Sequence, residues 1–245
     1  MLLITRPIAQ TKNLESLLLA NEIDFALFPT FEIKKLKPIF HTYQYDVIIF
    51  ISVNAVNYAE EYFDQLLLSP LKVFAVGPAT ANQLKRKNIK VDCYPKKNAS
   101  SQELLKMKEC QILSNNKILI IRGKGGSETL KNTLGIKNQV DYLEVYERVQ
   151  CELTFQHSQS FETFMNYSNG VLMATSEQSL VNIMRLVHSI SVDFIQILLT
   201  KKIIVFSERL RVLAKDHGFK NIEVTENPSD EDLVCLLYTS DAADE

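Results

Sequence analysis

Short apolar runs, each followed by a helical pattern, repeat along the whole chain. The clearest run lies in KILIIRGKGG (117–126), where four apolar residues, Ile118 to Ile121, stand in a row. Such a run predicts a strand buried on both faces. A glycine loop follows, and then a short helical segment to about Leu134. Strands that alternate with helices predict parallel α/β sheets, which bind ligands at the edge formed by the carboxyl ends of their strands.

The remaining pattern predicts further strands and helices in alternation. Strands are predicted at 2–5, 24–28, 46–52, 72–76, 90–94, 171–174, 203–206 and 221–225. Helices are predicted at 53–68, 78–88, 101–110, 161–167, 177–188, 194–199, 208–217 and 230–237, with one more before Asn21. The segments 31–36 and 140–150 alternate apolar and polar residues and therefore predict half-exposed connectors. The last residues, 239–245, show no apolar period and are taken as a tail outside the fold.

An internal echo predicts two similar domains. DVIIFISVNAV followed by VFAVGPATANQL resembles GVLMATSEQSL followed by IIVFSERLRVL. Each copy predicts strand, hydroxyl cap, helix, strand, turn and helix, so each predicts its own parallel sheet. The first strands have no partner sheet unless they join the second copy. We therefore expect a split domain, 1–30 with 151–238, and an inserted domain, 37–139, joined by the connectors 31–36 and 140–150.

Composition narrows the class of protein. The 245 residues are 46% hydrophobic and 23% charged, which allows one large or two small globular domains. A net charge of −2 disfavours a general nucleic-acid-binding protein. No apolar run approaches the ~20 residues of a membrane span, and MLLITRP predicts a first strand rather than a signal peptide. Four cysteines without CxxC spacing predict free thiols in a cytoplasmic protein, and four scattered histidines predict no metal site.

Cations and hydroxyl caps gather at the predicted carboxyl ends of the strands. The cations there are Arg6, Arg122, Lys124 and Arg209. Helices that begin at such positions direct free backbone N–H groups to the same edge, which favours anions. A cleft between two such edges would suit a ligand with several carboxylates or phosphates. The residues predicted to bind it are Arg6, Ser52, Asn54, Gly77, Arg122, Gly123, Thr175, Ser176, Ser207 and Arg209.

Several common catalytic motifs are missing from the sequence. GKGG is neither a Walker loop nor GxGxxG, and no GxSxG marks a nucleophile elbow. The chemistry is therefore expected to consist of binding, orientation and one proton transfer. Tyr146 alternates with Glu144 and Arg148 on one face of its segment, and its phenol could donate that proton. A packed aromatic residue on a β ribbon explains the same pattern.

An ordered set of segments resembles the uroporphyrinogen-III synthase family. The segments are LITRP (3–7), DVIIFISVNAV (46–56), VGPATA (76–81), ILIIRGKGGSETL (118–130), EVYERV (144–149), ATS (174–176) and FSERLRVLAKDHGFKNIEV (206–224). Together they extend over nearly the whole chain. In this resemblance Tyr146 matches a tyrosine thought to assist departure of a hydroxyl, and Thr80 matches a threonine of the VGxxTA turn. Ser52 and Ser176 match hydroxyls at strand ends, and Ser127 stands where related sequences have an arginine.

The resemblance implies a fold, a reaction and partners. The fold would be two flavodoxin-like, three-layer α/β domains with parallel sheets, joined by a two-stranded connector, the first domain being discontinuous. The enzyme would be a cytoplasmic, monomeric lyase of haem and other tetrapyrrole biosynthesis. It would close hydroxymethylbilane, a linear tetrapyrrole, to uroporphyrinogen III with inversion of ring D and loss of water. No cofactor or metal is implied, no nucleic acid or membrane is involved, and hydroxymethylbilane synthase would be a transient partner.

Two other classes of protein remain open from the sequence. One is a non-catalytic, two-lobed binding protein for a small polyanion, or a member of the family that has lost activity. Ser127 would favour it because this serine replaces an expected cation. The other is a protein-interaction module, which would show an exposed apolar patch or a charged tail. Formation of product from the bilane would separate the enzyme from both.

Overall fold

The computed structural model describes residues 1–38, 44–67 and 71–241. The chain divides into two compact units. Unit 1 comprises Met1–Ile33 and Val149–Glu245, and unit 2 comprises Lys34–Arg148. The discontinuous domain expected from the sequence ended at 30 and resumed at 151, a few residues from these boundaries.

Unit 1 contains a five-stranded parallel sheet in the order β10-β9-β8-β1-β2. Its strands are β1 (Leu2–Ile4), β2 (Phe25–Leu27), β8 (Val171–Ala174), β9 (Lys202–Val205) and β10 (Asn221–Val224). Counted along the chain within this unit, the order is 2-1-3-4-5, that of flavodoxin-like folds. The direction of winding therefore reverses between β1 and β8.

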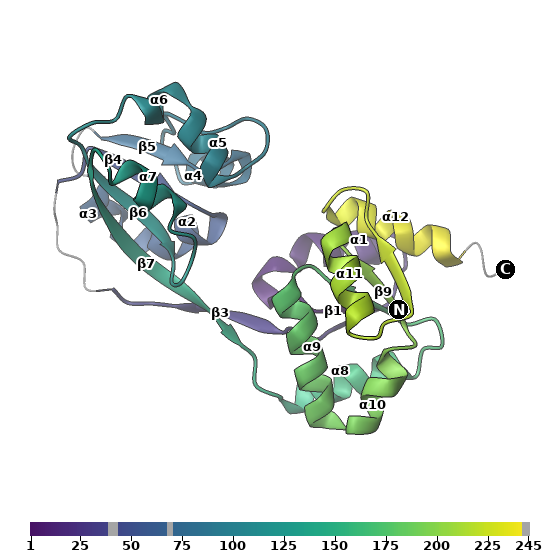
Figure 1. The fold of residues 1–245 in the computed structure, drawn as a ribbon. Coiled ribbons are helices and arrows are strands. Elements are labelled where there is room, and N and C mark those ends of the chain that lie inside the picture. The colour runs from purple at the N-terminus through teal and green to yellow at the C-terminus, as the bar shows by residue number, and fades with distance from the viewer. Residues whose placement is uncertain (39–43, 68–70, 242–245) are drawn as a thin grey trace. The chain divides into compact units, whose positions relative to one another are not determined.

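Helices cover both faces of this sheet (Figure 1). They are η1 (Ile8–Gln10), α1 (Lys12–Ala20), α8 (Phe155–Met165), α9 (Glu177–Ile190), α10 (Val192–Leu198), α11 (Glu208–Asp216) and α12 (Asp230–Asp241). Apolar residues of α8, α9, α10 and α11 pack on one face, and those of α1 and α12 pack on the other. Unit 1 is thus a three-layer α/β domain. Helix α12 continues to Asp241, beyond the predicted end near Leu237, so the predicted tail begins within it.

The second sheet, in the order β3-β7-β6-β4-β5, lies in unit 2 except for the first residues of β3 and the last residues of β7, which belong to unit 1. Its strands are β3 (Phe31–Lys35), β4 (Val47–Phe50), β5 (Lys72–Ala75), β6 (Lys117–Gly123) and β7 (Gln139–Gln150). The pairs β4–β5, β4–β6 and β6–β7 are parallel. The chain reverses its direction of winding between β4 and β6, as it does between β1 and β8 in the first sheet. The fifth strand differs, because β3 comes first along the chain in the second sheet whereas β10 comes last in the first sheet.

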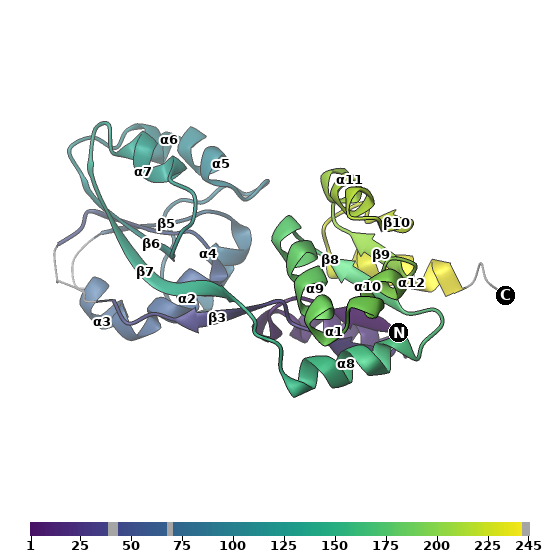
Figure 2. The ribbon, with the colours of Figure 1, turned by 60° about the horizontal axis from the view of Figure 1, so that its bottom comes forward.

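Two helical layers enclose this second sheet (Figure 2). The helices are α2 (Val53–Ala59), η2 (Glu60–Tyr62), α3 (Phe63–Leu66), α4 (Pro78–Arg86), α5 (Ser101–Lys106), α6 (Lys108–Gln111) and α7 (Thr129–Leu134). One face packs against α2, α3 and α4, and the other against α5, α6 and α7. The predicted helix 53–68 is divided into α2 and α3 by the 3-10 turn η2. Its last predicted residue lies outside the described residues. The predicted helix to Cys110 is interrupted at Met107, whose backbone is extended.

The segment 140–150, predicted as a connector, is a strand of the second sheet. Strand β7 pairs with β6 over its first part, from Gln139 beside Lys117 to Tyr146 beside Gly123. Its apolar residues Leu143 and Val145 are buried against the helices. The alternating pattern was ambiguous because a strand with one polar and one apolar face is typical both of a sheet edge and of an exposed ribbon. The other predicted connector, β3, lies beside β7 in the same sheet.

The predicted strand 90–94 is an isolated bridge between Cys93 and Phe74. The Asp92 carboxylate accepts the Val73 N–H at 2.9 Å, while the Asp92 N–H donates to the Val73 carbonyl at 2.8 Å. A side chain thus takes a position that a backbone carbonyl would occupy in a regular ladder. The segment accordingly follows β5 without forming a strand of its own.

Thiol labelling should distinguish one cysteine from the other three. Cys93, Cys110 and Cys151 are buried, while Cys235 is exposed on α12. Burial is the main cause that raises the pKa of Cys93 to about 11 and that of Cys110 to about 12. Since the thiolate is the reactive form, we expect Ellman's reagent at neutral pH to modify one thiol rapidly in the folded protein and four after unfolding. Two or more rapidly modified thiols in the folded protein would contradict this packing.

Candidate functional site

The best-assembled group of predicted residues lies where the strand order of unit 2 reverses. Ser52 follows β4, Gly123 ends β6, and Tyr146 lies beside Gly123 on β7. The Tyr146 hydroxyl is 3.1 Å from Ser52 Oγ. In open α/β sheets this reversal point opens a crevice outside the carboxyl ends of the strands. The predicted proton donor is therefore placed at the edge where such folds bind ligands.

A β-bulge directs Tyr146 to this position. The register of β6 and β7 shifts between Arg122, which pairs with Glu144, and Gly123, which pairs with Tyr146. The extra residue on β7 is Val145, and it reverses the alternation of side chains beyond it. Tyr146 consequently packs with the core on the α2 side, whereas Glu144 approaches Arg122. The sequence placed Tyr146 and Glu144 on one face, which is wrong because simple alternation does not account for a bulge.

Gly123 makes room for the Tyr146 ring. A Cβ atom at Gly123 would lie 2.5 Å from Cε2 and 2.6 Å from Cζ of that ring. Real Cβ atoms do not approach so closely, so the glycine is required by the packing and not by its backbone angles. The Tyr58 ring lies against Tyr146 with the two centroids 5.7 Å apart and a 34° angle between the planes. The phenol is therefore held between a bare backbone and a second aromatic ring.

Four predicted residues, Ser52 among them, lie around the helix starts of unit 2. Ser52 caps α2 by accepting the Ala55 N–H at 3.0 Å. Asn54 is half-buried in the first turn of the same helix. Gly77 precedes α4, and a Cβ there would lie 2.2 Å from the Ala99 Cβ. Thr80, in the first turn of α4, is 4% exposed, and its hydroxyl makes no hydrogen bond with any residue that the structure describes.

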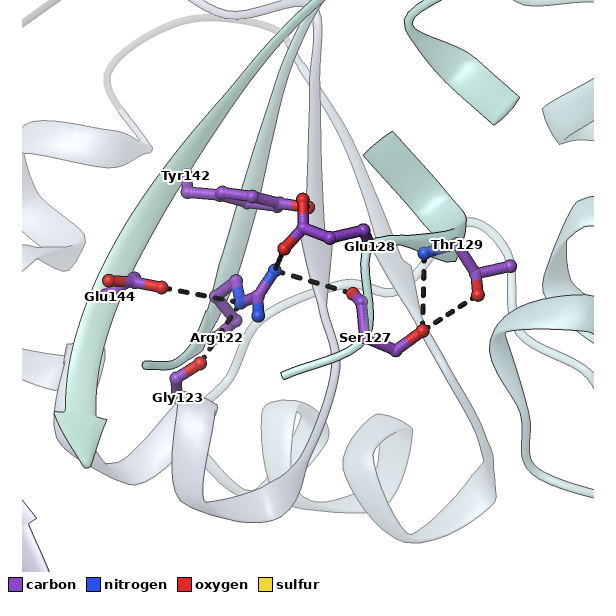
Figure 3. A network of polar contacts seen from close by, with 7 residues as sticks. All are labelled: Arg122, Gly123, Ser127, Glu128, Thr129, Tyr142 and Glu144. Carbon is purple, nitrogen blue, oxygen red and sulfur yellow. Dashed lines mark hydrogen bonds and ion pairs between the residues drawn. The ribbon is translucent and has the colours of Figure 1, made fainter. Parts of the chain in front are cut away.

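Arg122 lies on the face of the second sheet opposite to Tyr146, where it contacts the glycine loop (Figure 3). Its side chain is only 2% exposed, and its guanidinium lies 4.3 Å from the centroid of the Tyr142 ring. Nη1 donates to Glu128 at 2.9 Å, Nε donates to the Gly123 carbonyl at 3.1 Å, and Nε lies 3.7 Å from a Glu144 oxygen. The arginine is thus engaged by its own loop and strand. Whether it also holds a carboxylate of a substrate stays a prediction.

Glu128 joins the loop to both Arg122 and Tyr142. It accepts the Tyr142 hydroxyl at 2.9 Å, and this hydrogen bond, followed by that from Arg122, lowers the pKa of its carboxyl. Burial, with a further contribution from Glu128, raises the pKa of Tyr142 to about 12. The phenol therefore stays neutral, and the carboxylate stays charged, at physiological pH.

The charge on Glu128 should matter for stability only above acidic pH. A carboxyl with a lowered pKa in the folded state stabilises above its unfolded pKa of ~4.3, and this contribution is lost as the pH falls through the folded value. We therefore expect Glu128→Gln to lower the melting temperature by about 1–3 °C at pH 7 and not at pH 3, as measured by calorimetry. Glu226 is exposed, so Glu226→Gln is the matched control and should leave the melting temperature unchanged at both pH values. An equal loss for Glu128→Gln at both pH values would contradict the assignment.

The predicted residues of unit 1 lie at the carboxyl edge of the first sheet. Arg6 forms an ion pair with Asp230 at the start of α12, and its guanidinium is 5.2 Å from the centroid of the Phe206 ring. Ser176 caps α9 by accepting the Ser179 N–H at 3.1 Å, next to the half-buried Thr175. Ser207 caps α11. The Arg209 side chain is 78% exposed, and its Nη2 lies 3.7 Å from Glu177 Oε2.

A cavity of about 460 Å³ lies next to the ends of β1 and β2. Its lining is mostly apolar, including Pro7, Ile8 and Phe31, and contains the carboxylates Glu32 and Glu152. No lysine or arginine is among the described residues that line it. This composition does not suit a ligand with many carboxylates.

Sequence reasoning missed Tyr58, Tyr142 and Glu128. Tyr58 lies in a plain helical pattern, so nothing local marked it as the neighbour of Tyr146. Tyr142 stands two residues before Glu144 in an alternating segment, which indicated a shared face with Glu144 but not the arginine stacked on it. Over the described ranges, no cluster of three or more His, Cys, Asp or Glu residues is arranged to hold a metal ion, and no helix is long and apolar enough to cross a membrane.

Comparison with models of protein families identifies the family of this chain. The model described as "Uroporphyrinogen-III synthase HemD" matches residues 12–235. The match begins after β1 and includes the other strands of both sheets and most of the residues discussed above. The chain belongs to the uroporphyrinogen-III synthase family.

Relatives in this family are moderately similar in sequence. The uroporphyrinogen-III synthase of Escherichia coli (strain K12) is 26% identical over 196 residues, which is 78% of each chain. That of Salmonella typhimurium is 30% identical over 169 residues, 68% of this chain and 66% of the relative. Solved uroporphyrinogen-III synthases share the fold. The Helicobacter pylori protein gives a TM-score of 0.64 at 15% identity, with coverage of 88% of this chain and 92% of the other.

A mutant uroporphyrinogen III synthase of Thermus thermophilus gives a TM-score of 0.58 at 14% identity, with 99% of each chain covered. The solved synthases therefore support the two-unit α/β architecture, with two mainly parallel sheets, that the sequence predicted. The individual substrate-binding and catalytic residues of this chain stay predictions.

Proposed function

We propose that this chain catalyses the reaction of its family, the closure of hydroxymethylbilane to uroporphyrinogen III with inversion of ring D and loss of water. The observation that carries the proposal is the family match over residues 12–235. The arrangement of Tyr146, Ser52 and Gly123 at the reversal point of the second sheet supports it, because a phenol at the edge where such folds bind ligands could donate one proton.

Tyr146 is the proposed acid for departure of the hydroxyl group. The C–O bond of the hydroxymethyl group breaks as the phenol proton moves to the oxygen, so that water leaves and an azafulvene cation and a phenolate remain. Ring D then attacks through its substituted carbon and forms a spiro intermediate. Fragmentation and recombination close the inverted ring, and the proton lost from the last pyrrole carbon returns to the phenolate. Protons and charge therefore balance over the cycle.

Orientation is the main contribution expected from the protein. The free bilane closes by itself without inversion, so the enzyme has to hold ring D in the inverting geometry. We infer that backbone N–H groups at the helix starts near Ser52, Gly77 and Thr80, with the loop after Gly123, contact substrate carboxylates in unit 2. In unit 1 the proposed contacts are Arg6, Thr175, Ser176, Ser207 and Arg209.

The setting of the reaction follows from its chemistry. Because the free bilane closes spontaneously, we propose that hydroxymethylbilane synthase binds this protein transiently and transfers the bilane to it. A cytoplasmic location is supported by the four cysteines, which form no disulfide among the described residues, as is typical of a reducing compartment. The net charge of −2 supports a small-molecule substrate rather than a nucleic acid.

An isomer assay tests the proposed activity. Hydroxymethylbilane is generated in place by its synthase, this protein is added, and the products are oxidised and separated by chromatography. We expect mostly the type III porphyrin. Type I alone, the product of spontaneous closure, would reject the activity and favour a polyanion-binding protein.

A further inference from the structure

Ser52 is placed to do more than cap a helix. Its Oγ accepts the Ala55 N–H at 3.0 Å and lies 3.1 Å from the Tyr146 hydroxyl. A serine hydroxyl has one hydrogen to donate and two lone pairs to accept with. The Ala55 N–H uses one lone pair only. The hydrogen of Ser52 is therefore available to the phenol oxygen.

The packing of Tyr146 leaves its hydroxyl dependent on this one side chain. The ring is held by Gly123 and Tyr58, so the position of the phenol oxygen is set by the ring. Among the described residues, Ser52 alone forms a hydrogen bond with that oxygen. The direction in which the phenol proton points is thus decided by whether Ser52 donates or accepts.

We propose that Ser52 is a positioning residue for Tyr146. Its hydroxyl donates to the phenol oxygen, which directs the phenol proton away from Ser52 and toward the ligand-binding edge. After the proton has moved to the leaving hydroxyl, the same Ser52 hydrogen stabilises the phenolate. A hydrogen bond to a charged oxygen is roughly twice as strong as one between neutral groups, so the contact strengthens as the reaction proceeds. This inference rests on the proposed role of Tyr146 as the acid.

The proposal differs from a substrate-binding role in what it predicts for kinetics. A side chain that holds a substrate carboxylate contributes equally to the bound substrate and the transition state, so its loss raises KM. A residue that acts through the acid contributes only while the proton moves, so its loss lowers kcat and leaves KM nearly unchanged. One hydrogen bond of ordinary strength corresponds to roughly a tenfold change in rate.

A double-mutant cycle tests the coupling. The variants are Ser52→Gly, Tyr146→Phe and the two together, each assayed for kcat and KM by formation of the type III isomer. Glycine is chosen because it is nearly as good a helix cap as serine, so that α2 is retained. Ser52→Thr keeps both the cap and the hydroxyl and should restore the rate. Ser100→Gly is the matched control, since Ser100 caps α5 by accepting the Glu103 N–H at 3.1 Å.

We expect Ser52→Gly to lower kcat roughly tenfold in the wild type and by less than about twofold when Tyr146 is already phenylalanine. Ser100→Gly should leave kcat unchanged. An equal loss in both backgrounds, or a loss that appears in KM, would overturn the positioning role while leaving Tyr146 as the acid. Full activity of Tyr146→Phe alone would instead overturn the proposed acid, and the positioning role with it.

Discussion

Turnover should fall roughly 100-fold or more when Tyr146 is replaced by phenylalanine, because general acid catalysis typically contributes 10²–10⁴-fold. The ring stays in its place between Gly123 and Tyr58, so the change removes the phenolic proton and little packing. The measurement is kcat for type III isomer formation from hydroxymethylbilane, with circular dichroism to show that the fold is retained.

Tyr142→Phe is the matched control for this prediction. Tyr142 belongs to the same strand, and its hydroxyl donates to Glu128 beside Arg122. Removing that hydroxyl should loosen the loop contact and leave turnover within about twofold, since no proton transfer depends on it. If Tyr146→Phe kept the turnover of Tyr142→Phe, Tyr146 would not be the acid.

A single methyl group at Gly123 should be almost as damaging as the loss of the phenol. Gly123→Ala places a Cβ 2.5 Å from Cε2 of Tyr146, so the ring has to move by about an ångström. A displacement of that size at a reacting group can cost roughly 100-fold in rate. We therefore expect kcat to fall about 100-fold while the variant stays folded, because the Tyr146 ring is only partly buried and can shift outward.

The control for this change is Gly125→Asn in the same loop. A Cβ at Gly125 meets nothing within 4 Å, and its φ of +73° is one that asparagine tolerates. Because the proposed loop contacts to substrate use backbone N–H groups, kcat of Gly125→Asn should stay within a few-fold of the wild type, and any further loss should appear in KM. Equal losses for the two variants would indicate that the loop as a whole, and not the space above Gly123, determines activity.

Much of the fold could be predicted from the sequence. Continuous apolar runs such as Val47–Phe50 and Val171–Ala174 favour strands buried on both faces, because they are too short for a buried helix and are followed by cap signals. Hydroxyl caps such as Ser52, Ser176 and Ser207 were equally legible, and all three accept a backbone N–H in the structure. These signals depend only on residues that are close in the sequence, so they can be recognised without knowing which strands pair.

The site was less predictable because its geometry depends on distant pairing. The bulge at Val145 arises from the register of β7 against β6, and no glycine or proline within β7 marks it, although Gly123 lies opposite on β6. Arg122 looked like a free cation at a strand end, but Glu128 and Tyr142 engage it from outside its own strand. Strand and cap signals therefore predicted which residues lie at the carboxyl edges of the sheets, and only the structure showed which of them contact one another. Their roles in binding and catalysis stay predictions.

Hydrogen exchange with bound product tests most directly whether the chemistry takes place where the second sheet reverses its winding. Backbone amides in the first turn of a helix have no intrahelical partner and exchange fast unless a ligand covers them. With anaerobic uroporphyrinogen III, we predict slower exchange at 52–56, 77–81 and 123–126, and no change at 135–139 at the opposite edge of the sheet. Protection confined to 135–139, with the carboxyl edge unaffected, would contradict the account.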